Sequence, residues 1–338
     1  MDLATIWFLL IGVLLVGYAI LDGFDLGAGI LHLFVARDDT ERRTVLNAIA
    51  PVWDGNEVWL LTAGGALFAA FPPVYATVFS GFYLALMLLL VALILRAVSL
   101  EFRSKVEAPA WRATWDVIFA IGSFLPALLL GVAVGNVLRG VPLDAAGDYR
   151  DGLLGLLNPF ALLVGLLAVA MFTLQGASWL VLKTEGAIAE RSRTAARLGW
   201  PVFAVLWIAA TLFSSQDAPG LWDNFANPLA WLVPIAFAVV AVAYPLALRT
   251  RRELLAFLLS SGSIAGLIGI MGVSLYPNLV PALGGASPSL TVGNASSSDL
   301  TLTVMLAVAL IGMPIVIAYT AFIYSRFRGK VRAEGHGY

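Results

Sequence analysis

The strongest constraint in this chain is a series of apolar runs, each about as long as a membrane-crossing helix. A helix of about 20 apolar residues spans the hydrocarbon core of a bilayer. Hydrophobic residues make up 60% of the 338 residues, so too few polar side chains remain to cover a water-facing surface. The sequence therefore predicts an all-α integral membrane protein. About nine transmembrane helices are expected, at Ile6 to Ile30, Ile49 to Phe71, Val74 to Leu95, Trp115 to Leu138, Asn158 to Leu182, Trp200 to Leu212, Pro228 to Leu248, Leu254 to Tyr276 and Leu300 to Tyr324.

The distribution of basic residues predicts how the chain is oriented, because cytoplasmic loops retain lysine and arginine. Of the 20 basic residues, 18 follow alternate spans, and only Arg139 and Arg150 fall on the opposite side. We therefore expect an outside N-terminus, a cytoplasmic C-terminus and an odd number of spans. The five basic groups are Arg37, Arg42 and Arg43; Arg96, Arg103, Lys105 and Arg112; Lys183, Arg191, Arg193 and Arg197; Arg249, Arg251 and Arg252; and Arg326, Arg328, Lys330 and Arg332.

Charge and residue counts exclude several kinds of function. The net charge of −1 lacks the basic footprint of a nucleic-acid-binding protein. The absence of cysteine excludes disulfides, thiolate catalysis, iron–sulfur clusters and cysteine zinc sites. The two histidines, His32 and His336, are too few to ligate several haems. We expect no metal site, and we expect His32 to form hydrogen bonds at the membrane interface, with metal or haem ligation as the alternative.

Four acidic residues fall where the chain is expected to be inside the membrane. Asp22 and Asp25 lie in the inner half of the first span, and Asp54 and Glu57 lie near the inner start of the second. An acid at the centre of a transmembrane helix costs about 2.5–3.5 kcal/mol on insertion scales, so these side chains must face protein or water. Each pair has i, i+3 spacing and therefore shares a helical face. The two pairs are expected to meet at similar depth.

Such a cluster is a candidate proton path. Burial and neighbouring like charges both favour the protonated carboxyl, so these acids could exchange protons near neutral pH. The competing interpretation is static pairing with partner residues. Asp116 is a weaker candidate, because it stands four residues after Arg112 in the first turn of a helix, where an ion pair is expected.

Other local features predict packing rather than chemistry. Three Gly-x-x-x-Gly segments begin at Gly23, Gly131 and Gly262, and small residues at this spacing let helices approach closely. The largest outer loops, Arg139 to Leu157 and Pro277 to Asp299, are too short for a soluble domain. One polytopic membrane domain is expected over residues 1–338.

Several segments resemble subunit II of cytochrome bd-type quinol oxidases. The resemblance is densest in the first 140 residues and weakest over residues 186–226. It is carried by GYAILDGFDLGAGIL at 17–31, APVWDGNEVWLLTAGGALFAAFP at 50–72, SGFYLALMLLLVALILRAVSLEFRSK at 80–105, GSFLPALLLGVAVGN at 122–136, TLQGASWL at 173–180 and LTLTVM at 300–305.

The resemblance implies an architecture and a partner. It implies two four-helix bundles, at 1–138 and 158–276, a ninth helix at 300–325 and a cytoplasmic tail at 326–338. It also implies a prokaryotic cytoplasmic membrane and a partner subunit I that carries haems b and d. The complex would oxidise quinol and reduce O2 to water, building a membrane potential. This chain would hold no haem and perform no catalysis alone. A small single-helix accessory subunit is a further implied partner.

The resemblance also implies roles for particular residues. Asp54 corresponds to the acid at the entrance of the family's cytoplasmic proton path, and Asp22 and Asp25 match its first-helix acids. Glu57 stands where some members have glutamine. Some members hold a structural quinone in subunit II, but no motif places one in this chain.

Two other functional classes fit parts of the pattern. Glycine- and proline-interrupted spans with buried acids are also typical of a proton- or cation-coupled secondary transporter. A structural scaffold, whose acids only pair with another subunit, is the third hypothesis.

Overall fold

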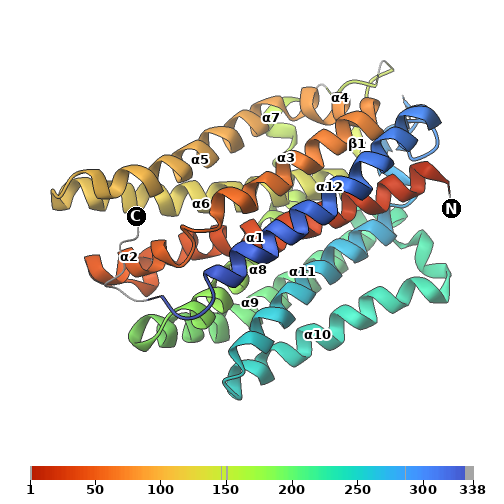
Figure 1. The fold of residues 1–338 in the computed structure, drawn as a ribbon. Helices are drawn as coiled ribbons and strands as arrows, with labels where there is room; N and C mark the ends of the chain where they lie inside the picture. Colours follow the sequence, from red (N-terminus) through yellow and green to blue (C-terminus); the bar gives the residue numbers. More distant parts are fainter. Residues whose placement is uncertain (1, 146, 150, 286, 332–338) are drawn as a thin grey trace.

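The computed structural model describes residues 2–145, 147–149, 151–285 and 287–331. Its helices are α1 (Leu3–Val35), α2 (Asp39–Asn47), α3 (Trp53–Ala70), α4 (Pro72–Gly81), α5 (Tyr83–Phe102), η1 (Arg103–Lys105), α6 (Pro109–Arg139), α7 (Gly152–Gly155), α8 (Pro159–Lys183), α9 (Gly186–Asp217), η2 (Pro219–Ala226), η3 (Pro228–Trp231), α10 (Leu232–Arg249), α11 (Glu253–Leu275) and α12 (Asp299–Arg326). The strands are β1 (Val141–Pro142), β2 (Asn278–Val280), β3 (Ala282–Leu283) and β4 (Leu290–Thr291). Figure 1 shows the long helices lying side by side.

Eight helices in the described part of the chain are long and apolar enough to cross a membrane: α1, α5, α6, α8, α9, α10 with η3, α11 and α12. This confirms the expected all-α, multi-pass architecture. The expected span from 49 to 71 corresponds to α3, which is not among the eight and begins with the polar residues Asp54, Asn56 and Glu57. The total of nine spans and the orientation remain predictions.

Two expected span boundaries were wrong. The run from 74 to 95 is divided by a bend at Phe82 into α4 and α5, and α5 continues past the expected end to Phe102. At this bend, the Phe82 ring packs edge-on against the ring of Tyr149, which comes from an outer loop. The span expected at 200–212 is the middle of α9, whose polar ends remain helical beyond the apolar run.

The helices pack as a continuous layered structure. On one side α1 packs with α3 and α6, and α5 packs with α6; on the other, α8 packs with α9 and α11, and α10 with α11. Helix α8 also lies along both α1 and α6, which joins the two sides (Figure 1). The division into two four-helix bundles plus one helix remains a prediction.

The expected close approaches of glycine helices are confirmed. A Cβ at Gly27 of α1 would collide with the Phe172 carbonyl oxygen and the Gly176 backbone of α8. Gly135 of α6 lies against Ala161 of α8 in the same manner, and Gly266 of α11 lies against Phe237 of α10. Small residues therefore set the spacing between these helices.

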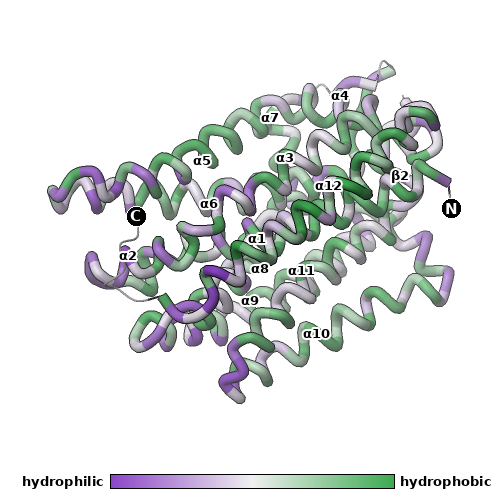
Figure 2. Tube along the Cα trace, viewed as in Figure 1, coloured by the Kyte–Doolittle hydropathy of each residue, from purple (hydrophilic) through white to green (hydrophobic). Residues whose placement is uncertain are grey.

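One end of the molecule, here called the inner end, carries α2, the loop between α5 and α6 and the end of α12, and is predicted to be cytoplasmic. Figure 2 shows hydrophilic residues concentrated at the helix ends and a hydrophobic middle. Ion pairs join the loops at the inner end, including Arg191 Nη2 to Glu41 Oε1 at 2.6 Å and Lys330 Nζ to Glu253 Oε2 at 2.6 Å. At the other end, β1 pairs with β3 and β2 pairs with β4.

Helix α12 lies across α1 and α3 and has most of its surface exposed, as Figure 1 shows. At its outer end, Leu302 accepts a hydrogen bond from the Trp7 indole, and Ser297 just before the helix bonds to Ala69 and Ala70 at the end of α3. At its inner end, residues 327–331 form a segment, here called the strap, that folds back onto α8 and α11. Lys183 donates to the carbonyls of Phe327 and Gly329, and Lys330 reaches Glu253.

Candidate functional site

The structure places two of the four predicted membrane acids against one buried arginine, with a third acid close by. Arg96 of α5 is 1% exposed, and its Nη1 lies 2.7 Å from Asp22 Oδ1 of α1. Its Nη2 lies 3.6 Å from Glu57 Oε2 of α3. An ion removed from water is costly unless it is paired, so Arg96 and the two acids stabilise one another. Asp22, Asp25 and Glu57 are called the carboxylate cluster below.

Asp25 is held by a separate set of hydrogen bonds. Its side chain is 1% exposed, and its Oδ2 accepts from Nδ2 of Asn56 at 2.8 Å. The carbonyl oxygen of Asn56 in turn accepts from the Tyr324 hydroxyl of α12 at 2.8 Å. Within the described residues, Asp25 Oδ1 makes no hydrogen bond, although it is buried. One oxygen of this carboxylate is therefore positioned and the other remains available.

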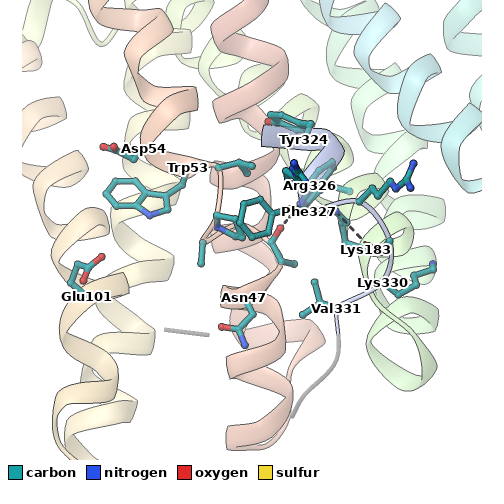
Figure 3. A pocket seen from close by; sticks show the side chains of 17 residues that line it. Asn47, Trp53, Asp54, Glu101, Lys183, Tyr324, Arg326, Phe327, Lys330 and Val331 are labelled. Atoms are coloured by element: carbon teal, nitrogen blue, oxygen red, sulfur yellow. Dashed lines mark hydrogen bonds between the residues drawn. The ribbon is translucent and has the colours of Figure 1, made fainter. Parts of the chain in front are cut away.

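Asp54 lies apart from the other predicted acids. It is exposed and lines an open pocket of about 1240 Å³ at the inner end of the molecule. Figure 3 shows Asp54 and Glu101 on one wall of this pocket, with Tyr324, Lys183 and the strap on the other. We call this space the inner pocket. The expectation that all four acids form one cluster therefore holds for three of them.

The acids become more buried with distance from the inner pocket. Asp54 is exposed, the Glu57 side chain is 23% exposed, and Asp22 and Asp25 are almost inaccessible. Asp54 and Glu57 stand in the first two turns of α3, near the positive end of the helix dipole. The acids thus range from an exposed position at the inner pocket to fully buried positions.

Asp116 belongs to a second polar cluster, and its predicted partner was wrong. Asp116 pairs with Arg103 at 2.6 Å, Arg42 at 2.9 Å and His32 Nε2 at 2.7 Å. Arg112, four residues away on α6, instead pairs with Asp39 at 2.9 Å. Two residues of α2 take the place of the expected pair: Arg42 pairs with Asp116, and Asp39 pairs with Arg112. This cluster joins α1, α2, η1 and α6 at the inner end.

His32 forms a hydrogen bond as expected, but it is fully buried rather than interfacial. In the described residues, no group of three or more histidine, aspartate or glutamate side chains is arranged to hold a metal ion. His336 and the tail from residue 332 lie outside the described residues.

Arg96, Asn56 and Tyr324 were not identified from the sequence. The expected span ends at Leu95, which places Arg96 in a basic loop. The residues after it, AVSLEF, are still largely apolar, and this was the available signal that the helix continues. Tyr324 carried no signal, because its partner Asn56 is distant in the sequence and the contact depends on how α12 packs.

A second cavity, of about 390 Å³, lies between α1, α6, α8, α9, α10 and α11. Its walls are almost entirely apolar and include the indole rings of Trp207, Trp222 and Trp231. No acidic side chain lines it, although Tyr18 in its wall lies beside Asp22 of the carboxylate cluster. The cavity suits an apolar chain rather than a charged ligand.

Taken together, these features define a multi-pass membrane protein with buried, partly paired carboxylates. Residues 3–327 match the sequence family described as cytochrome bd terminal oxidase subunit II, and the chain belongs to this family.

Similar proteins cover nearly the whole chain. The Escherichia coli K12 protein named cytochrome bd-I ubiquinol oxidase subunit 2 is 42% identical over 363 residues, covering 98% of this chain and 96% of that protein. The Bacillus subtilis cytochrome bd ubiquinol oxidase subunit 2 is 36% identical over 332 residues, covering 98% and 97%. A solved chain of bd oxidase from Geobacillus thermodenitrificans has a TM-score of 0.81 at 20% identity, covering 97% of this chain and 99% of that one. The last comparison shows a shared fold.

Proposed function

We propose that this chain is the haem-free subunit II of a quinol-oxidising cytochrome bd complex and that it conducts protons from the inner side. Its relatives in Escherichia coli and Bacillus subtilis are named ubiquinol oxidase subunits. The observation that carries the proton role is the order of Asp54, Glu57, Asp22 and Asp25 from the inner pocket into the membrane interior.

The residues of this chain do not fit the ligation of the haems. His32 is the one histidine in the described residues, and its Nε2 is bonded to Asp116. We therefore assign haems b and d to the partner, subunit I, where quinol oxidation and O2 reduction would occur. Reducing one O2 to two waters takes four electrons and four protons. If quinol releases its protons outside and these four come from inside, the reaction is electrogenic without pumping.

The surface of α3 supports pairing with subunit I. Thr62 and Gly65 are exposed on this helix, and a Cβ at Gly65 would meet nothing within 4 Å. Small residues on a membrane-facing surface favour contact with another helix, because they allow close backbone approach. Helix α3 also exposes Leu61 and Phe68. Helix α10, however, contains no glycine, and its exposed side chains include Leu232, Val239 and Val242, which suit lipid. We place subunit I on the α3 face; an accessory single-helix subunit remains a prediction.

The apolar cavity is our proposed location for a structural quinone. Its indole-lined walls and volume of about 390 Å³ suit part of an isoprenoid chain, and no charged side chain lines it.

The proton role is tested by Asp54→Asn in the purified complex, with Glu101→Gln as the matched control on the same pocket wall. We expect turnover with Asp54→Asn to fall about tenfold or more, because the entry acid can no longer exchange a proton. Glu101→Gln should retain wild-type turnover. Oxygen consumption and haem content are measured together.

Unchanged turnover in Asp54→Asn, with normal haem content, would contradict the proton role and favour the scaffold hypothesis. Copurification with a haem-bearing partner separates the oxidase function from the transporter alternative, which requires a colourless protein that is stable alone.

A further inference from the structure

Tyr324 connects the last helix of the chain to the most buried part of the carboxylate cluster. Its hydroxyl donates to Asn56 Oδ1 at 2.8 Å, and Asn56 Nδ2 donates to Asp25 Oδ2 at 2.8 Å and to the Leu21 carbonyl at 3.3 Å. The three side chains come from α12, α3 and α1. Asn56 is 2% exposed, so bulk water does not compete for either end of its amide.

The hydroxyl supports the orientation of the Asn56 amide in which the NH2 group faces Asp25, because it is the donor that the amide oxygen then needs. One end of an asparagine amide only accepts hydrogen bonds and the other only donates. While the Tyr324 hydroxyl donates to the oxygen, the NH2 group must face Asp25. The reversed amide would place its oxygen against the carboxylate oxygen, and a buried, unpaired acceptor is costly.

Tyr324 also lies at the boundary between the inner pocket and the cluster. It lines the pocket with Asp54, and its ring packs edge-on against Trp179 with centroids 6.0 Å apart (Figure 3). The indole of Trp179 is itself held by the Ala48 carbonyl at 3.0 Å. Because the strap binds Lys183 and Glu253 just beyond the helix end, the position of Tyr324 depends on the docking of α12.

We infer that Tyr324 is a positioning residue for proton handling at Asp25, acting through the Asn56 amide. The inference rests on the proposed proton function and extends it to α12. The amide holds one oxygen of Asp25, so the other is presented in a constant orientation. The charged and titratable groups around Asp25 are Asp22 on its own helix, Glu57 on α3, Arg96 on α5 and Tyr324 itself. Tyr18 of α1 lies beside Asp22 in the same group of side chains.

The test is Tyr324→Phe in the purified complex, with Tyr319→Phe as the matched control on an exposed face of α12. We expect the acidic limb of the turnover–pH profile to move by about one pH unit toward higher pH, because the ionised carboxylate loses an aligned donor. Tyr319 is 64% exposed, and its variant should follow the wild-type profile. Haem content is measured in each preparation.

Asn56→Ala provides a second, independent variant and should displace the profile in the same direction. If Tyr324 acts through Asn56, the double variant will match Asn56→Ala alone. Displacements that add fully in the double variant would overturn the inference, because they would show two independent effects. A wild-type profile in Tyr324→Phe would overturn it as well.

Asp25→Asn separates this inference from the function on which it rests. Wild-type turnover and pH dependence in Asp25→Asn would remove the proton role of Asp25, and the inference with it. Impaired turnover in Asp25→Asn, together with a wild-type profile in Tyr324→Phe, would remove the inference alone.

Discussion

Arg96 is the residue on which the charge balance of the membrane interior depends. It is the buried cation between Asp22 and Glu57, and it lies inside a membrane helix. An uncompensated charge in hydrocarbon is costly, whereas a matched pair is tolerated. Asp22 is therefore held mainly as an ionic partner, and Asp25 has no direct contact with a cation among the described residues. This difference favours Asp25 over Asp22 for the proton role that we propose.

A residue outside the membrane gives a prediction about pH. The Arg191 guanidinium hydrogen-bonds both carboxylate oxygens of Glu41 and holds the pKa of that carboxyl at about 2, below its usual 4.5. The pair therefore stabilises the fold fully above about pH 4.5, and the stabilisation is lost as pH falls toward 2. The difference in Tm between wild type and Glu41→Gln should be largest near pH 6 and should shrink steadily toward pH 3.

Thermal unfolding of the detergent-solubilised protein measures this difference. Glu107→Gln, at an exposed position on the same end, is the control and should follow wild type throughout. A Glu41→Gln deficit that does not change with pH would contradict the prediction.

Individual residues were predictable where a local rule applied. Asp22 and Asp25 could be recognised as facing protein because acids in an apolar run are costly if they face lipid. Arg112 was assigned to Asp116 by helical spacing, but the folded-back α2 brings Asp39 closer. Such partners depend on tertiary packing between distant segments, which spacing within one helix does not report.

At the level of elements, the contact of α1 with α8 depends on glycine. Gly27→Ala should lower the Tm clearly, because the new methyl group collides with the Phe172 carbonyl and the Gly176 backbone, and overpacking of this kind costs about 1–3 kcal/mol. Gly12→Ala on the same helix is the control, since nothing lies within 4 Å of its Cβ position. Equal Tm values for the two variants would show that α1 and α8 separate at little cost.

Element identity was largely predictable, because long apolar runs leave few alternatives to membrane helices. The ends of the helices were less predictable. The polar residues that extend α9 to Gly186 and Asp217 are helical because neighbouring loops and ion pairs support them, including Arg193 with Glu253 at 3.2 Å. Hydropathy reports only the part of a helix that lies in lipid.

For the whole molecule, the contrast between the α3 and α10 surfaces predicts where the partner binds. Gly65→Trp should remove most of the haem that copurifies with this chain, because the bulky ring prevents close approach on the α3 face. Val239→Trp, at a 64% exposed position on α10, should retain normal haem content. Absorbance of the reduced haems per mole of purified chain measures both. Normal haem content in Gly65→Trp would place the partner elsewhere.

The overall architecture followed from the sequence to the extent that hydropathy and charge determine it. The membrane location and helical class are confirmed, whereas the exposure of α12 and its contact with α3 were not evident from any run or motif. Helix α12 is apolar on all its faces over most of its length, and this sequence pattern is the same for a central and for a peripheral membrane helix.

The link from Tyr324 to Asp25 joins α12 to α1 through Asn56 of α3. Since the ribosome makes α1 and α3 well before α12, the Asn56 amide receives its tyrosine donor only after residue 324 has been added. A product truncated before α12 that inserts into the membrane would thus lack this donor, and Asn56 would face Asp25 without its support.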